Sequence, residues 1–213
     1  MINIVSYNQY EIKLGGSIQD IKKGFNVWID ITDPNIDDVL LIFGQLNSGG
    51  ESLQWYLETS LKPDKPEVRL FQNHSHTTIS VMKNDSPKEG IHMLLGESWL
   101  LSLHSSKIDL MCFADRLLKN NRITLGRMYA LYYNLIEHVV ASYEQLLTPI
   151  ESSLDEFQTD GNTRPENIFE YVTQLSQQLS SVKLYFKNIS SFLNVLIHNA
   201  QNGDELKYID HSK

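Results

Sequence analysis

The sequence is poor in cysteine: its 213 residues include a single one, Cys112. One cysteine excludes an intrachain disulfide and any zinc or iron–sulfur site that needs several thiolates, and it favours a reducing compartment. We expect a packing role for Cys112. Positive charge is scarce too, because 18 lysines and arginines stand against 26 aspartates and glutamates, a net charge of −8. This surplus of negative charge argues against nucleic acid or an anionic membrane surface as the main partner and favours cations or basic partners.

Long apolar runs and catalytic motifs are lacking as well. No stretch approaches the roughly 18 uninterrupted apolar residues of a membrane-spanning helix, and the N-terminus has no secretory or organellar targeting pattern. We therefore expect the chain as given to be soluble. The sequence has no G-x-S-x-G, no P-loop, no G-x-G-x-x-G and no H-E-x-x-H. We accordingly expect no catalytic residue, no bound organic cofactor and no enzymatic activity.

What is present is a globular composition, 41% apolar and 10% aromatic, whose pattern changes near residue 122. Before that point, short apolar runs alternate with turn signals, which predicts strands over 2–7, 10–14, 25–31, 67–72, 76–83, 91–95 and 99–104. Short helices are expected from Ser17 to Gly24, from Asn35 to about Leu46, and over 51–60. The entry to the second helix is Thr32-Asp33-Pro34-Asn35, where a capping oxygen precedes a proline. Strands joined by hairpins are antiparallel, so we expect a mixed sheet.

After residue 122 the apolar residues recur every three or four positions, which predicts a helical hairpin with arms near 124–158 and 165–200. In the second arm the steps alternate between four and three residues, the 3.5-residue repeat of a coiled-coil seam. The predicted fold class is α/β, an αβα arrangement with a mixed sheet between helices, followed by a long antiparallel helical hairpin. We divide the chain into a mixed-sheet part, 1–121, a hairpin packed on it within the same domain, 122–201, and a polar tail, 202–213.

Four short motifs follow one another along nearly the whole chain. Residues 27–34 read V-W-I-D-I-T-D-P, residues 65–71 read K-P-E-V-R-L-F, residues 95–104 read L-G-E-S-W-L-L-S-L-H, and residues 129–136 read Y-A-L-Y-Y-N-L-I. In this order they resemble the W-I-D/N-I, R-P-K-x-E-x-F, L-x-x-N-x-L-I-T-x-H and L-L-x-x-L-I-D segments of the CorA family of divalent-cation transporters. The resemblance implies an αβα domain at the cytoplasmic face of the cell membrane, with five copies of the full-length protein around a pore.

The same resemblance implies a function. In the family a stalk helix and two transmembrane helices, with a Gly-Met-Asn loop between them, follow this domain, and none of these occurs in the sequence. We expect the chain to be cut before them. It would then be the regulatory domain of a magnesium or cobalt transporter, with the homopentamer and divalent cations as its partners and the membrane reached only through segments absent here. The alternatives are the zinc-transporting branch of the family and a free-standing αβα interaction module that binds a partner through its helical hairpin.

Two groups of residues are candidate metal ligands. His74 and His76 lie two apart on a strand and so share a face, and a pair of imidazoles suits Zn²⁺ or Co²⁺. Near the hairpin tip, Glu151, Asp155 and Glu156 offer the oxygen ligands that Mg²⁺ prefers. For both groups we favour the plainer interpretation: a solvated strand end for the histidines and a solvated acidic face for the carboxylates.

A regulatory metal site is expected to be missing from the helix over 51–60. Many family members carry adjacent acidic residues there that help to hold Mg²⁺ between subunits, and Gln54-Trp55 stands in that place here. Glu51 and Glu58 remain, but two helical turns separate them, roughly 10 Å along the axis. We therefore expect no defined Mg²⁺ site on this helix, although Mg²⁺ or Co²⁺ could still be the transported ion or bind weakly.

Overall fold

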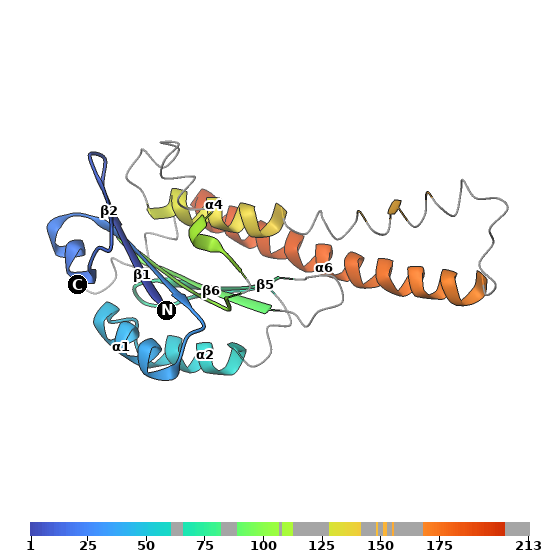
Figure 1. The fold of residues 1–213 in the computed structure, drawn as a ribbon, viewed down its shortest axis with the longest axis horizontal. Helices are drawn as coiled ribbons and strands as arrows, with labels where there is room; N and C mark the ends of the chain where they lie inside the picture. Colours follow the sequence, from blue (N-terminus) through green and yellow to red (C-terminus); the bar gives the residue numbers. More distant parts are fainter. Residues whose placement is uncertain are drawn as a thin grey trace.

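The computed structural model describes residues 1–60, 66–81, 89–106, 108–112, 128–141, 148, 151–152, 155 and 168–202. A seven-stranded mixed sheet forms its centre, in the order β2-β1-β3-β7-β6-β5-β4 (Figure 1). Strands β3 and β7 pair in parallel, and the other neighbours in the sheet pair antiparallel. The strands are β1 (Ile2–Tyr7), β2 (Ile12–Leu14), β3 (Asn26–Thr32), β4 (Glu67–Leu70), β5 (Ser75–Val81), β6 (Glu89–Leu95) and β7 (Trp99–His104).

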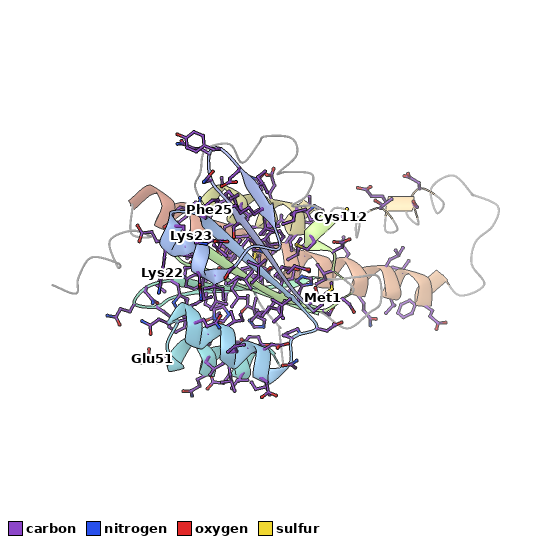
Figure 2. The ribbon with its side chains drawn as sticks, turned by 60° about the vertical axis from the view of Figure 1, so that its left-hand side comes forward. Met1, Lys22, Lys23, Phe25, Glu51 and Cys112 are labelled. Carbon is purple, nitrogen blue, oxygen red and sulfur yellow. The ribbon has the colours of Figure 1, made fainter. Side chains whose placement is uncertain are left out.

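Helices cover both faces of the sheet (Figure 1). One face carries α1 (Ile36–Leu46) and α2 (Gly50–Ser60), and the opposite face carries α4 (Met128–Ala141) and the C-terminal part of α6 (Ile168–Asn202). Figure 2 shows Glu51 on the layer of α1 and α2 and Cys112 on the other side of the sheet. We call these the α2 face and the α4 face.

Local sequence explains how the first helices begin. Ser17 caps the 3-10 helix η1 (Ile18–Lys23) with its side chain, Asp20 completes the capping box, and Gly24 ends the helix in the left-handed conformation at φ 82°. Helix α1 is capped by Asn35, whose side chain accepts a hydrogen bond from the Asp38 amide. The predicted capping oxygen before Pro34 is therefore wrong: Asp33 adopts φ 49° and accepts a hydrogen bond from the Ser106 amide instead.

Alternation along the strands divides the core into two layers, because successive side chains point to opposite faces of a sheet. On the α2 face, Val27, Ile29 and Leu101 pack against Ile42 and other apolar residues of α1. On the α4 face, Trp28, Ile91 and Met93 pack against α4 and against Ile189 and Phe192 of α6. Full burial of one large apolar side chain stabilises the fold by about 1.5–3 kcal/mol, so the two layers hold the sheet from both sides.

The structure confirms the αβα fold class, the mixed sheet and the predicted strands and short helices, with shifts of a few residues at their ends. The second hairpin arm is confirmed as α6, while the first is described over α4 and its continuation lies largely outside the described residues. The division at residue 122 and the coiled coil stay predictions. The packing role of Cys112 is wrong, because its side chain is exposed.

Helix α6 has 35 residues and is therefore about 52 Å long. The end that includes Ile189 and Phe192 packs on the sheet, and the N-terminal half extends past the sheet (Figure 1). There Val172 and Leu179, two residues of the predicted seam, remain about half exposed. Within the residues that the structure describes, no helix combines the length and apolarity needed to cross a membrane.

Candidate functional site

Two hydrogen-bonded clusters of mostly buried polar side chains lie on opposite faces of the sheet. The first, which we call the Asp30 cluster, consists of Trp28, Asp30, Ser102 and His104 on the α4 face. The second, which we call the histidine chain, consists of Ser52, Asn73, His74, His76 and His92 on the α2 face. Buried polar groups cost stability unless they find hydrogen-bond partners. The hydrogen bonds within each cluster therefore matter for the stability of the fold.

The parallel pairing of β3 with β7 assembles the Asp30 cluster. In this register Asp30 lies opposite Ser102, and Thr32 lies opposite His104. The Trp28 indole Nε1 donates to Ser102 Oγ at 3.0 Å, and Ser102 Oγ donates in turn to Asp30 Oδ1. His104 Nε2 lies 3.0 Å from the same Asp30 oxygen. One carboxylate oxygen thus binds side chains from both motifs, 27–34 and 95–104.

His104 is a charged imidazolium in this arrangement. Its Nε2 faces the Asp30 carboxylate and its Nδ1 faces the Ser105 carbonyl at 2.8 Å, and neither partner has a hydrogen to give. Both ring nitrogens must therefore donate. Burial alone would lower the pKa of His104, but the hydrogen bond and negative charge of Asp30, together with the Ser105 carbonyl, outweigh burial and raise it.

Asp30 itself is incompletely satisfied. Its side chain is 1% exposed, and its second oxygen, Oδ2, is buried without a hydrogen-bond partner among the described residues. An unpaired buried oxygen normally costs about 1–3 kcal/mol, and the imidazolium of His104 offsets part of that cost.

The histidine chain joins α2 to the sheet. Ser52 Oγ of α2 lies 2.8 Å from His74 Nε2 and 3.2 Å from His76 Nδ1, so one hydroxyl bridges two imidazoles. His76 Nε2 lies 3.3 Å from His92 Nδ1 on the neighbouring strand β6. Beyond His74, the Asn73 side chain lies 2.7 Å from His74 Nδ1 and donates to the Asn47 carbonyl at the end of α1.

Aromatic rings enclose the three imidazoles. The Trp55 ring meets His76 edge-on at 4.3 Å, and the Tyr56 ring meets His92 in the same way at 4.8 Å. Phe71 stacks on His74 at 5.1 Å. In this apolar environment burial lowers the pKa of His74 and of His92 to about 4. Burial and the neighbouring imidazoles lower the pKa of His76 well below its usual value. All three rings are neutral at pH 7.

The solvated strand end predicted for His74 and His76 is wrong. Both side chains are buried, at 5% and 0% exposure, because α2 covers this part of the sheet. Their nitrogens face Ser52, Asn73 and His92 rather than one common point. Across the described ranges, no three His, Cys, Asp or Glu side chains are grouped so that they could hold a metal ion.

The carboxylates proposed near the hairpin tip are only partly described. Glu151 and Asp155 are exposed, and Glu156 lies outside the described residues. On α2, Trp55 is buried while Gln54 donates to the exposed Glu58 at 2.9 Å. Glu151 and Asp155 therefore occupy exposed helical positions, unlike the buried histidines.

Sequence reasoning missed Ser52 and the convergence of Trp28, Asp30, Ser102 and His104. The only signal was the alternation in W-I-D-I and L-L-S-L-H, which puts polar residues at every second position of runs that are otherwise apolar. Such a position inside a buried strand predicts a polar partner across the sheet, but not which partner.

Comparisons with known proteins bear on the whole chain. The sequence matches the family model described as CorA-like Mg²⁺ transporter protein over residues 25–212. No curated protein matches it. The fold is similar to the complete structure of the CorA magnesium transporter from Methanocaldococcus jannaschii, with a TM-score of 0.67 at 17% identity, over 99% of this chain and 71% of that one.

Two isolated domains are also similar. The soluble domain of CorA from Methanocaldococcus jannaschii gives a TM-score of 0.61 at 17% identity, over 99% of this chain and 90% of that domain. The ZntB cytoplasmic domain from Vibrio parahaemolyticus gives 0.51 at 13% identity, over 94% of this chain and 99% of that domain. At these identities the likeness establishes the fold.

Proposed function

Because this chain belongs to the CorA-like Mg²⁺ transporter protein family, we propose that it is the cytoplasmic regulatory domain of a magnesium or cobalt transporter. The observation that carries the proposal is the likeness to the CorA soluble domain, which extends over 99% of this chain and 90% of that domain. The proposal assigns transport rather than catalysis to the chain, with a pore formed elsewhere in the assembled protein.

The zinc-transporting branch is the second candidate, and the likeness to the ZntB cytoplasmic domain supports it. Neither buried cluster indicates which ion is transported, because the ion would cross the membrane away from both. A third candidate, a module that binds a partner through its helical hairpin, draws support from the half-exposed Val172 and Leu179 on α6. For the transporter we further propose a homopentamer, held mainly by helices outside this domain.

A chimaeric transporter tests the proposal. The chain is joined to the membrane part of CorA from Methanocaldococcus jannaschii, purified, and reconstituted in liposomes loaded with a divalent-cation dye. We expect influx of Mg²⁺ and Co²⁺ above that of empty liposomes and different from that of liposomes that hold the membrane part alone. The proposal is overturned if the chimaera assembles as the native protein does but carries neither ion, or if its influx equals that of the membrane part alone.

The matched control is the same chimaera with Asp30→Ala, which removes the carboxylate at the centre of the α4 face. Flux that depends on a folded regulatory domain should change in this variant. Flux that is identical in both would mean that the domain has no influence on the pore.

A further inference from the structure

The contacts of the histidine chain fix which ring nitrogen carries each hydrogen. The Asn73 side-chain amide donates to the Asn47 carbonyl at 2.8 Å, so its nitrogen points to Asn47 and its oxygen faces His74. An amide oxygen only accepts hydrogen bonds. His74 Nδ1, 2.7 Å away, must therefore carry the hydrogen, and in a neutral ring this leaves His74 Nε2 as an acceptor.

The same reasoning passes along the chain to β6. His74 Nε2 accepts from the Ser52 hydroxyl at 2.8 Å, and because this hydroxyl has a single hydrogen, its oxygen accepts from His76 Nδ1 at 3.2 Å. His76 Nε2 is then an acceptor and receives the hydrogen of His92 Nδ1 at 3.3 Å. The Thr78 hydroxyl oxygen, 3.3 Å from the same nitrogen, accepts that hydrogen as well. Every link points the same way, from His92 to the Asn47 carbonyl, and every neutral imidazole carries its hydrogen on Nδ1.

Ser52 is the member of this chain that belongs to α2, so the direction of the chain and the seating of α2 are linked. Among the described residues, no carboxylate contributes to the shifts in the pKa of the three imidazoles. Trp55 and Tyr56 of α2 and Trp99 of β7 meet the rings with their aromatic faces or edges. The Arg69 guanidinium of β4 lies over the Trp55 ring, 5.2 Å from its centroid, and is itself positive.

We propose that the histidine chain is a pH-dependent latch that holds α2 on the sheet. One added proton can be absorbed: with His74 doubly protonated, the Ser52 hydroxyl turns to donate to His76 Nδ1, His76 moves its hydrogen to Nε2, and His92 accepts. The links from His74 to His92 survive with their directions reversed, and the single hydrogen of His92 moves to Nε2. A second proton places two N–H groups opposite each other or leaves the hydroxyl hydrogen without an acceptor, so at least one link is lost and α2 is released.

The pH range follows from the environment of the rings. Because burial lowers the pKa of His74 and of His92 from 6.5 to about 4, the neutral chain contributes its full stability above pH 6.5. That contribution is lost as the pH falls from 6.5 towards 4. Acid, rather than alkali, opens the latch.

Nitrogen NMR on the full chain with ¹⁵N-labelled histidine tests the hydrogen positions directly. At pH 7.5 we expect the spectra of His74, His76 and His92 each to report a hydrogen on Nδ1. A hydrogen on Nε2 of any of the three neutral rings would overturn the proposal, whatever the behaviour of variants.

Hydrogen exchange of the α2 amides tests the latch. After correction for the intrinsic pH dependence of exchange, we expect protection of residues 50–60 to fall at least tenfold between pH 7 and pH 4.5, while β3 keeps its protection. The variant His92→Gln removes one titrating ring and should reduce the fall, whereas the control His104→Gln, on the opposite face, should keep it. Unchanged α2 protection down to pH 4.5 in the unaltered chain would overturn the latch, even if the variants fail to fold.

Discussion

The two faces of the central sheet use histidine in opposite electrical states. On the α2 face, three imidazoles are buried among aromatic rings and are neutral, because no carboxylate of the described residues lies against them. On the α4 face, His104 is as deeply buried but is charged, because Asp30 lies against it. One carboxylate therefore decides the protonation state, and burial by itself does not.

Removing that carboxylate should have the largest effect. Asp30→Ala leaves the acceptors of Ser102 and His104 missing and a cation buried without its partner, which typically costs about 3–5 kcal/mol. We expect a loss of this size in the free energy of unfolding, measured with urea at pH 6. The control Asp37→Ala, an exposed acid on α1, should change it by less than about 1 kcal/mol. A loss below 1 kcal/mol for Asp30→Ala would mean that Asp30 and His104 are not an ion pair.

A smaller loss is expected on the neutral face. Ser52→Ala removes the hydroxyl between two uncharged rings, leaving His74 Nε2 and His76 Nδ1 unpaired, at a cost of about 1–3 kcal/mol. The neighbouring exposed residue gives the control, since Gln54→Ala should alter unfolding by about 0.5 kcal/mol or less. If Ser52→Ala lowers the free energy of unfolding as much as Asp30→Ala does, then charge does not explain the different stabilities of the two clusters.

Above pH 7, the pH dependence of the free energy of unfolding should report the contribution of His104. Its pKa is raised in the folded state, so its contribution is complete below the unfolded pKa of about 6.5 and is lost as the pH rises through the folded value. The slope of unfolding free energy with pH is at most about 1.4 kcal/mol per unit for one proton. In a series of urea titrations from pH 6 to 9, His104→Gln should flatten this alkaline decline. An identical decline in the variant would assign it to another group.

Magnesium should have the smallest effect. On α2, Glu58 accepts a hydrogen bond from Gln54, and Glu51 lies two turns away, so the two carboxylates cannot share an ion within one chain. A concentration of 10 mM Mg²⁺ would occupy a site of millimolar affinity and so stabilise the fold. We expect it to shift the melting temperature no more than a salt of equal ionic strength does. A further rise of several degrees that Glu58→Gln abolishes would reveal a site on this helix and make the two faces differ in metal binding as well.

Much of the fold could be predicted because its signals are local. Alternation indicated the strands, and a capping serine with a glycine seven residues beyond it indicated the ends of η1. Trp28 is buried, in keeping with its place in the apolar run of β3. By contrast, β3 pairs with β7 across more than 70 residues of sequence, and no local pattern specifies such a partner.

The burial of the histidines could not be predicted either, because it too depends on a distant segment. The run Gln72-Asn73-His74-Ser75-His76 is polar throughout and reads as solvated. Its two histidines are nevertheless buried, because α2, whose sequence lies some 20 residues earlier, places Ser52 and Trp55 against them. Whether a polar strand end meets water or a helix is decided by tertiary packing, which the strand's own sequence does not encode.

Helix α6 has the mechanics of a lever. The sheet grips it near Ile189 and Phe192, and its first residue, Ile168, lies 21 positions or about 32 Å from that grip. Over such an arm, a rotation of 10° at the grip would sweep the far end through about 5 Å, close to the rise of one full helical turn. A repacking of a single side chain between the sheet and α6 would thus be magnified, at the tip, into a movement large enough to change which residues of a neighbouring helix it meets.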